Sequence, residues 1–138
     1  MTVTRRELIR EFIPRSPLVR HLGIELQRLE PDLAELVLPY RAEVATVGDV
    51  VHGGAIATLI DTAAMAAAWA DDEEVHESAT GSTVSMTVDY VEAARGGDLL
   101  ATAKPVRRGR SICFCEVTVT EPPGERVVAK GSAVYRFA

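Results

Sequence analysis

One carboxylate in this sequence is surrounded by apolar residues, where its burial costs free energy. Asp61 is in the middle of an alanine-rich run, and Leu59, Ile60, Ala63 and Ala64 surround it. Burial of an unpaired carboxylate costs several kcal/mol as an order of magnitude, so Asp61 is expected to have either a function or a hydrogen-bond partner. One purpose is chemical, as a general base or a nucleophile. The alternative, which the sequence leaves open, is a hydrogen bond to a neighbouring backbone group or to a second subunit.

A histidine and two glycines, His52-Gly53-Gly54, come directly before the same run. Glycine lets another molecule approach the backbone closely, and the first N–H groups of a helix are unpaired donors at the positive end of its dipole. Such amides suit an oxyanion hole, which binds the negative charge that develops on a carbonyl oxygen. The alternative is an ordinary junction between loop and helix that needs small residues.

The spacing between these two candidates has a geometric consequence. Gly53 and Asp61 are about 12 Å apart along a helix, given a rise of about 1.5 Å per residue. A carbonyl carbon and its attacking water are only about 3.5 Å apart in a reactive pose. We therefore expect a two-fold dimer in which Asp61 of one chain lies beside Gly53 of the other, so that two chains share each site.

A basic turn is the third candidate. Arg107, Arg108 and Arg110 lie close together around Gly109. Guanidinium groups bind phosphates with a forked geometry, so this turn favours a nucleotide-bearing substrate. The alternative is solvated charge on an exposed turn.

The composition predicts one soluble cytoplasmic domain of 138 residues. A net charge of −5 argues against general nucleic-acid binding, and no apolar run is long enough to span a membrane. The N-terminus lacks the apolar stretch of a signal peptide. No metal is expected, because the three histidines do not have the spacing of ligands. Cys113 and Cys115 share one face of an extended segment and are interpreted as free, buried side chains.

The hydrophobic pattern defines the elements that must position these residues. A capping box formed by Thr4 and Glu7 predicts a first helix from about Arg5 to Ile13, which Pro14 and Pro17 end. The alanine-rich run predicts a long helix that the rest of the fold encloses. The predicted strands are Gly23–Arg28, Leu33–Leu38, Ser82–Val91, Asp98–Val106, Ile112–Glu121 and Arg126–Phe137.

This order of elements favours an α+β domain in which an antiparallel sheet wraps around one helix. Short turns join consecutive strands, and Gly96-Gly97 is expected to turn residues 82–91 into the next strand. Alternation within 82–91 predicts that Met86 and Tyr90 share one face and that Thr83 lies on the other. The acidic residues 71–74 are interpreted as a solvated helix end and loop.

The segment Val51-His52-Gly53-Gly54, followed by Leu59 and Asp61, resembles the HGG…D signature of hotdog-fold acyl-CoA thioesterases, in particular the phenylacetic-acid-degradation class. The resemblance extends from about Leu22 to Tyr135. It implies a hotdog fold, with residues 1–138 as a single thioesterase domain and residues 1–20 as its N-terminal helical segment. It also implies a homodimer or a homotetramer (a dimer of dimers) with active sites at subunit interfaces.

The resemblance also implies roles for individual residues. The catalytic carboxylate of the family falls on Asp61, the amide donor to the thioester carbonyl on Gly53, and the motif histidine on His52. A hydroxyl residue that orients water in some members falls on Thr83. Many members have Asn or Gln upstream of the histidine, where this chain has Thr46. The residues expected to contact the substrate or its coenzyme A are Thr46, Gly54, Arg108, Gly109 and Arg110.

The implied function is hydrolysis of an acyl-coenzyme A thioester to the free acid and CoA, with Asp61 as base or nucleophile. Two alternatives stay open: a non-catalytic acyl-CoA-binding or regulatory hotdog protein, and a hotdog dehydratase or hydratase. No cofactor is expected apart from the coenzyme A of the substrate. The expected partners are a small-molecule acyl-CoA and a second copy of the chain, without nucleic acid or membrane.

Overall fold

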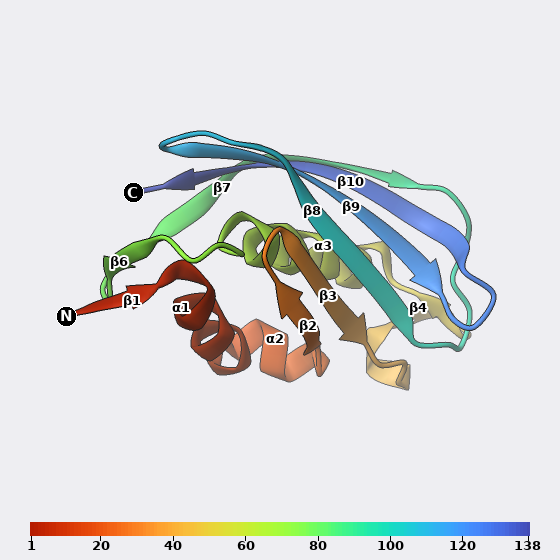
Figure 1. Ribbon diagram of the computed structural model, residues 1–138. Coiled ribbons are helices and arrows are strands. Elements are labelled where there is room, and N and C mark those ends of the chain that lie inside the picture. Colours follow the sequence, from red (N-terminus) through yellow and green to blue (C-terminus); the bar gives the residue numbers. More distant parts are fainter.

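The central sheet of the molecule has six antiparallel strands that curve over one long helix (Figure 1). The computed structural model describes all 138 residues. The strands lie in the order β2-β3-β8-β9-β10-β7. The predicted α+β class, with an antiparallel sheet wrapped around a helix, is confirmed. The six strands are β2 (Glu25–Glu30), β3 (Leu33–Leu38), β7 (Gly81–Tyr90), β8 (Leu99–Arg108), β9 (Ile112–Glu121) and β10 (Arg126–Phe137).

The enclosed helix is α3 (Gly53–Ala68), the product of the alanine-rich run. Ten of its 16 residues are buried, and most of these are alanines. Small side chains let the strands approach the helix closely. At Gly131 of β10, an added Cβ would lie only 2.5 Å from Cγ2 of Ile60, so a side chain at position 131 would push helix and sheet apart.

The sheet topology differs from the expected run of hairpins at one place. The turn at Gly96-Gly97 joins β7 to β8, but these two strands are not neighbours. β7 pairs instead with β10 and forms one edge of the sheet, whereas β8 pairs with β3 and β9. The prediction of short turns between adjacent strands is therefore wrong for β7 and β8 and correct for β8, β9 and β10.

The N-terminal segment adds two helices below α3 (Figure 1). The predicted capping box is present at the start of α1 (Arg5–Phe12), since Thr4 accepts from the Glu7 amide and Glu7 accepts from the Thr4 amide. The 3₁₀ turn η1 (Ile13–Arg15) follows. The expectation that Pro17 only terminates helix is wrong, because Pro17 occupies the first turn of α2 (Pro17–Leu22), where a missing N–H costs nothing.

Short strands hold the connections in place. β1 (Thr2–Thr4) pairs with β6 (Glu74–His76), and β4 (Ala45–Val47) pairs with β5 (Val50–Val51) after the 3₁₀ turn η2 (Ala42–Val44). The first pair ties the N-terminus to the segment that follows α3. None of the helices combines the length and the apolar character needed to cross a lipid bilayer.

Candidate active site

Asp61 lies on the only stripe of α3 that the rest of the chain leaves partly open. Thr58, Asp61 and Met65 are half-buried on this stripe, while the residues on the other faces of the helix are buried. A cavity of about 210 Å³ opens beside them. Its walls come from α3, from the start of β7 and from the N-terminal helices. The carboxylate is therefore accessible to a small molecule without being fully solvated.

A single hydrogen bond within the chain orients the carboxylate. The hydroxyl of Thr83 donates to Oδ1 of Asp61 over 2.7 Å. The second oxygen, Oδ2, has no hydrogen-bond partner in the chain. One oxygen is thus fixed and the other is free in a carboxylate that lines the cavity, which is the arrangement that a base or a nucleophile needs.

A β-bulge brings Thr83 to Asp61. Tyr135 of β10 pairs with Thr83 and the adjacent Val134 pairs with Ser85, so Val84 is an extra residue in β7. The extra residue reverses the alternation of side chains, because a shift of one position moves every side chain to the opposite face. The expectation that Thr83 lies on the opposite face from Met86 is wrong: both face α3.

The N-terminal end of α3 has a backbone N–H group that is not used within the chain. His52 caps the helix, and its Nδ1 accepts a hydrogen bond from the Gly54 amide over 2.7 Å. Nδ1 acts as an acceptor, so in a neutral ring the proton is on Nε2. The Gly53 N–H has no acceptor within the chain. It is available to polarise a carbonyl oxygen, as expected for an oxyanion donor.

Tyr90 packs directly on Gly53, a contact that the sequence did not predict. Its hydroxyl donates to the Gly53 carbonyl oxygen over 2.8 Å. An added Cβ on Gly53 would lie 3.3 Å from the ring, tighter than most side-chain contacts. Tyr90 therefore gives a local reason for glycine at position 53, in addition to the open access that the amide needs.

The helix between the two ends is continuous. The structure brings Thr83 to Asp61, and it brings His52, Gly54 and Tyr90 to Gly53, but it does not bring these two groups together within one chain. Their separation along α3 is about 12 Å at about 1.5 Å per residue. No group of three or more His, Cys, Asp or Glu side chains is placed to hold a metal ion.

Comparison with protein-family models identifies the type of enzyme. Residues 48–132, which include both ends of α3 and all of β7 to β9, match the model described as the thioesterase superfamily. The chain belongs to the thioesterase superfamily. The resemblance noted in the sequence, and with it the expectation of a thioester hydrolase, is confirmed.

Similar proteins share both sequence and fold with this thioesterase. The medium/long-chain acyl-CoA thioesterase YigI of Escherichia coli is 27% identical, over 90% of this chain and 87% of that protein. A thioesterase family protein from Silicibacter pomeroyi has a TM-score of 0.85 at 24% identity, with 96% and 97% of the two chains covered. The E. coli PaaI protein from the phenylacetic acid degradation operon has a TM-score of 0.82 at 18% identity, covering 97% and 93%. These two likenesses show the hotdog fold.

Arg108 of the thioesterase lies at the far end of α3 rather than on an open turn. Its guanidinium donates to the carbonyl oxygens of Ala68 over 3.0 Å and Ala67 over 2.9 Å, and to Asp32 over 2.7 Å. The positive charge thus caps the negative end of the helix dipole. Burial lowers the pKa of Arg108, but the hydrogen bond to Asp32 and the charge of Asp71 outweigh burial and raise it. A contact of Arg108 with the substrate stays a prediction, and its guanidinium already has these partners within the chain.

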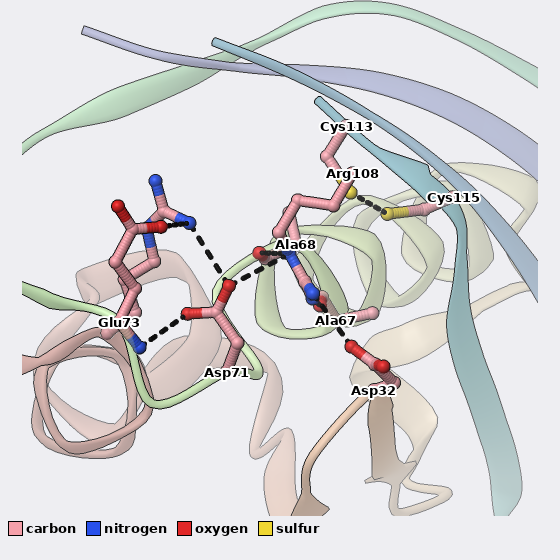
Figure 2. A network of polar contacts seen from close by, with 9 residues as sticks. Asp32, Ala67, Ala68, Asp71, Glu73, Arg108, Cys113 and Cys115 are labelled. Atoms are coloured by element: carbon pink, nitrogen blue, oxygen red, sulfur yellow. Dashed lines mark hydrogen bonds and ion pairs between the residues drawn. The ribbon is translucent and has the colours of Figure 1, made fainter. Parts of the chain in front are cut away.

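The acidic segment after α3 is also bound rather than solvated. Asp71 lies between two guanidinium groups, 3.1 Å from Arg5 and 3.3 Å from Arg108 (Figure 2). Arg5 also pairs with Glu73 over 2.8 Å. The expectation of a solvated acidic loop is therefore wrong for Asp71, whose carboxylate joins the N-terminal helix to the end of α3.

The other residues expected to contact substrate lie on the surface. The Gly109 amide closes the turn between β8 and β9 by donating to the Ile112 carbonyl over 2.7 Å. Arg110 is exposed on that turn and has no ion pair in the chain. Thr46 is exposed on β4, close to the start of α3, because the next strand of that pair leads into His52.

The two cysteines are free and buried, as predicted. Their sulfur atoms lie 3.7 Å apart on the inner face of β9. The hydrogen bond from Cys115 lowers the pKa of Cys113, and the charge of Arg108 acts in the same direction against burial. Neither thiol lines the Asp61 cavity.

Proposed function

We propose that this thioesterase hydrolyses the thioester of an acyl-coenzyme A to the free acid and CoA. The observation that carries the proposal is the pairing of two features on one helix: a half-buried carboxylate with one free oxygen, and an unpaired amide at the positive end of the dipole. The similarity to YigI, which is named for medium- and long-chain acyl-CoA, supports an acyl-CoA substrate.

In the proposed reaction, Asp61 acts as a general base. Oδ2 of Asp61 takes a proton from water as the water oxygen attacks the thioester carbonyl carbon. The carbonyl oxygen becomes negatively charged and accepts a hydrogen bond from the Gly53 amide. When the tetrahedral intermediate collapses, the carbon–sulfur bond breaks, and the proton on Asp61 passes to the departing CoA thiolate. Thr83 keeps Oδ1 occupied, so that Oδ2 is the oxygen that faces the water.

We propose further that two chains share each site. The 12 Å spacing supports this, since about 3.5 Å separates the reacting atoms. β7 is an edge strand, and its outer side has no partner within the chain. A two-fold pairing of β7 strands would run antiparallel and bring the helices of two chains together, with Asp61 of one beside Gly53 of the other. A homodimer is thus the smallest active unit, and two homodimers can associate further into a homotetramer.

Compartment and CoA binding complete the proposal. Acyl-CoA substrates and free cysteines both suit a reducing compartment, so we place the protein in the cytoplasm. We assign the CoA phosphates to Arg110 and the neighbouring backbone of Gly109, because Arg108 is engaged at the end of α3. Thr46 and Gly54 lie near the thioester end of the bound substrate in this arrangement.

The experiment is a turnover screen across acyl-CoA thioesters of increasing chain length, read by release of the CoA thiol. Asp61→Asn keeps the shape and a hydrogen bond but removes the basic oxygen, so kcat should fall about 100-fold or more. Asp89→Asn is the matched control, since Asp89 is exposed on the outer face of β7.

Three outcomes would contradict the proposal. Near-native turnover by folded Asp61→Asn would remove the carboxylate from the mechanism. Tight binding of acyl-CoA by the wild type without thiol release would favour the non-catalytic binding protein, and addition or loss of water on an enoyl-CoA would favour the hydratase.

A further inference from the structure

A second, larger cavity continues from the Asp61 cavity along α3. It has a volume of about 460 Å³, within the range of about 300–1,000 Å³ typical of small-molecule sites. The two cavities share four lining residues, so they adjoin each other, and we treat them together as one groove between α1 and α3. The shared residues are Phe12, Met65, Gly81 and Tyr135.

The floor of this groove is apolar and its rim is charged. The apolar residues that line its far part are Leu8, Ile9, Trp69 and Ala79. The charged lining residues Glu11, Arg15 and Glu77 are all exposed, so their charges lie at the rim and not in the floor. An apolar floor below a charged rim suits a flexible hydrocarbon chain better than a polar or charged group.

The groove starts at the carboxylate and ends at a fixed wall. Asp61 and Trp69 are eight positions apart on or next to α3, which corresponds to about 12 Å at about 1.5 Å per residue. Trp69 is held in an edge-to-face cluster, with ring centroids 6.3 Å from Tyr135 and 5.3 Å from Phe137. A buried aromatic cluster of this kind does not move aside easily, so Trp69 is a fixed part of the groove wall about 12 Å from the carboxylate.

The wall formed by α1 is firmly attached. The backbone amides of Arg5 and Arg6 donate to the carbonyl oxygens of Glu73 and Asp71 over 2.9 and 3.0 Å. The Arg6 guanidinium pairs with Asp72 over 2.9 Å, and that of Arg5 stacks on the Phe137 ring at 4.0 Å from its centroid. All of α1 lies outside the region that the family model matches, residues 48–132, so this wall is supplied by the chain beyond that region.

We propose that the groove between α1 and α3 binds the acyl chain of a medium-chain acyl-CoA, with the carbonyl at Asp61 and the methyl end against Trp69 and Ala79. This inference rests on the proposed function and adds the class of acyl group. Phe12 and Met65 line the passage between the two cavities, and Ala79 sets the length of chain that fits.

The test reads occupancy of the groove without turnover. Trp69 is the only tryptophan of the chain, so its fluorescence reports directly on the far end of the groove. The probes are S-decyl-CoA and S-ethyl-CoA, two thioethers that cannot be hydrolysed. S-decyl-CoA should change the Trp69 emission, and S-ethyl-CoA should bind through its CoA part and leave the emission unchanged.

A blocked groove supplies the second measurement. Ala79→Phe fills the far end and should weaken binding of S-decyl-CoA by about tenfold or more, measured by calorimetry, with little change for S-ethyl-CoA. Ala42→Phe, on the exposed turn η2, is the matched control for the added aromatic ring. If Ala79→Phe does not fold, Leu8→Gln is the alternative variant. Glutamine is a good helix former and places an amide in the groove, so it should give the same selective loss of S-decyl-CoA binding.

The outcomes separate this inference from the proposed function. Calorimetric binding of S-decyl-CoA with unchanged Trp69 emission, and equal affinities in wild type and the blocked variants, would overturn the acyl groove even if acyl-CoA is hydrolysed. A decyl-specific emission change in a chain that releases no thiol would keep the groove and overturn the hydrolase. A chain that binds neither thioether contradicts both.

Discussion

The hydroxyl of Tyr90 lies 2.8 Å from the carbonyl oxygen of Gly53 and donates a hydrogen bond to it. The ring packs on the same glycine, where an added Cβ would lie 3.3 Å from it. Tyr90 thereby fixes the first peptide of α3, whose amide is the proposed donor to the thioester carbonyl. It is a positioning residue, because it acts through Gly53 and not on the substrate.

Tyr90→Phe should lower kcat about tenfold, or about 1.4 kcal/mol in the barrier, and leave KM nearly unchanged. The ring and its packing remain, so only the hold on the Gly53 carbonyl is lost. Steady-state kinetics with one acyl-CoA substrate checks the separation of kcat from KM, and the thermal midpoint checks folding. Tyr40→Phe is the matched control, because the Tyr40 hydroxyl makes no hydrogen bond within the chain and only its backbone amide does. An unchanged kcat in Tyr90→Phe would show that the helix start needs no support from the hydroxyl.

The effect on kcat of a substitution at Thr83 should depend only on whether the new residue keeps the hydroxyl. Thr83→Ser keeps the donor to Oδ1 of Asp61, so we expect kcat within about threefold of wild type. Thr83→Val keeps the shape and removes the donor, so the carboxylate loses its orientation and kcat should fall about tenfold or more. The measurement is kcat for both variants at saturating substrate. Equal activity of the two variants would mean that Asp61 is oriented by something other than this hydrogen bond.

Mixed dimers test whether two chains share a site. Gly53→Pro removes the amide donor at the first helix position, where no hydrogen bond within the helix is lost, and Asp61→Ala removes the base; each should be nearly inactive as a pure dimer. In a mixed dimer with shared sites, one site receives both defects and the other receives neither. Co-expression at equal levels should restore about a quarter of wild-type activity, because about half of the dimers are mixed and each has one intact site.

The control for that experiment is the fraction of mixed dimers, verified with a different affinity tag on each chain. Activity that stays at the level of the parental variants, in a sample with verified mixed dimers, would assign each site to one chain.

The two arginines around Gly109 should separate into a structural and a binding residue. Arg108→Ala removes one donor from each of two carbonyl oxygens and two carboxylates, so the free energy of unfolding should fall by about 2–3 kcal/mol. Arg110→Ala should leave stability unchanged and raise KM for acyl-CoA, but not for a truncated thioester that lacks the nucleotide. Urea unfolding and paired KM values are the measurements. A stable Arg108→Ala with raised KM would reverse the assignment.

Most of the fold was accessible from the sequence because its signals are local. The capping box at Thr4, the alanine-rich helix and the bounds of β9 and β10 follow from residue types and their spacing. The pairing of β7 with β10 could not be predicted from the sequence. The turn signal at Gly96-Gly97 predicts that β7 and β8 are neighbours, but the chain crosses the end of the sheet there. Helix α2 was missed because Pro17 marks a helix start as readily as an end.

The candidate site was predicted in its residues but not in its contacts. His52, Gly53 and Asp61 were identified by their spacing on one helix. The bulge at Val84 that turns Thr83 toward Asp61 has no signal in an alternating sequence. The ion-pair partners of Arg108 are Asp32 and Asp71, which are far from it in the sequence, so local patterns do not predict these contacts. The contact of Tyr90 with Gly53 had one signal in the sequence, namely the glycine itself, whose missing side chain leaves room for the ring.

The crossing of the chain from β7 to β8 has a consequence for the order in which the molecule assembles. β8, β9 and β10 form a local meander whose short loops need little closure entropy, so this meander can form first. β7 joins it only at β10, on the far side from β8, and β3 joins it only at β8. We therefore expect the edge that carries Thr83 and Tyr90 to be completed late, so that these two residues reach Asp61 and Gly53 only after the meander has formed.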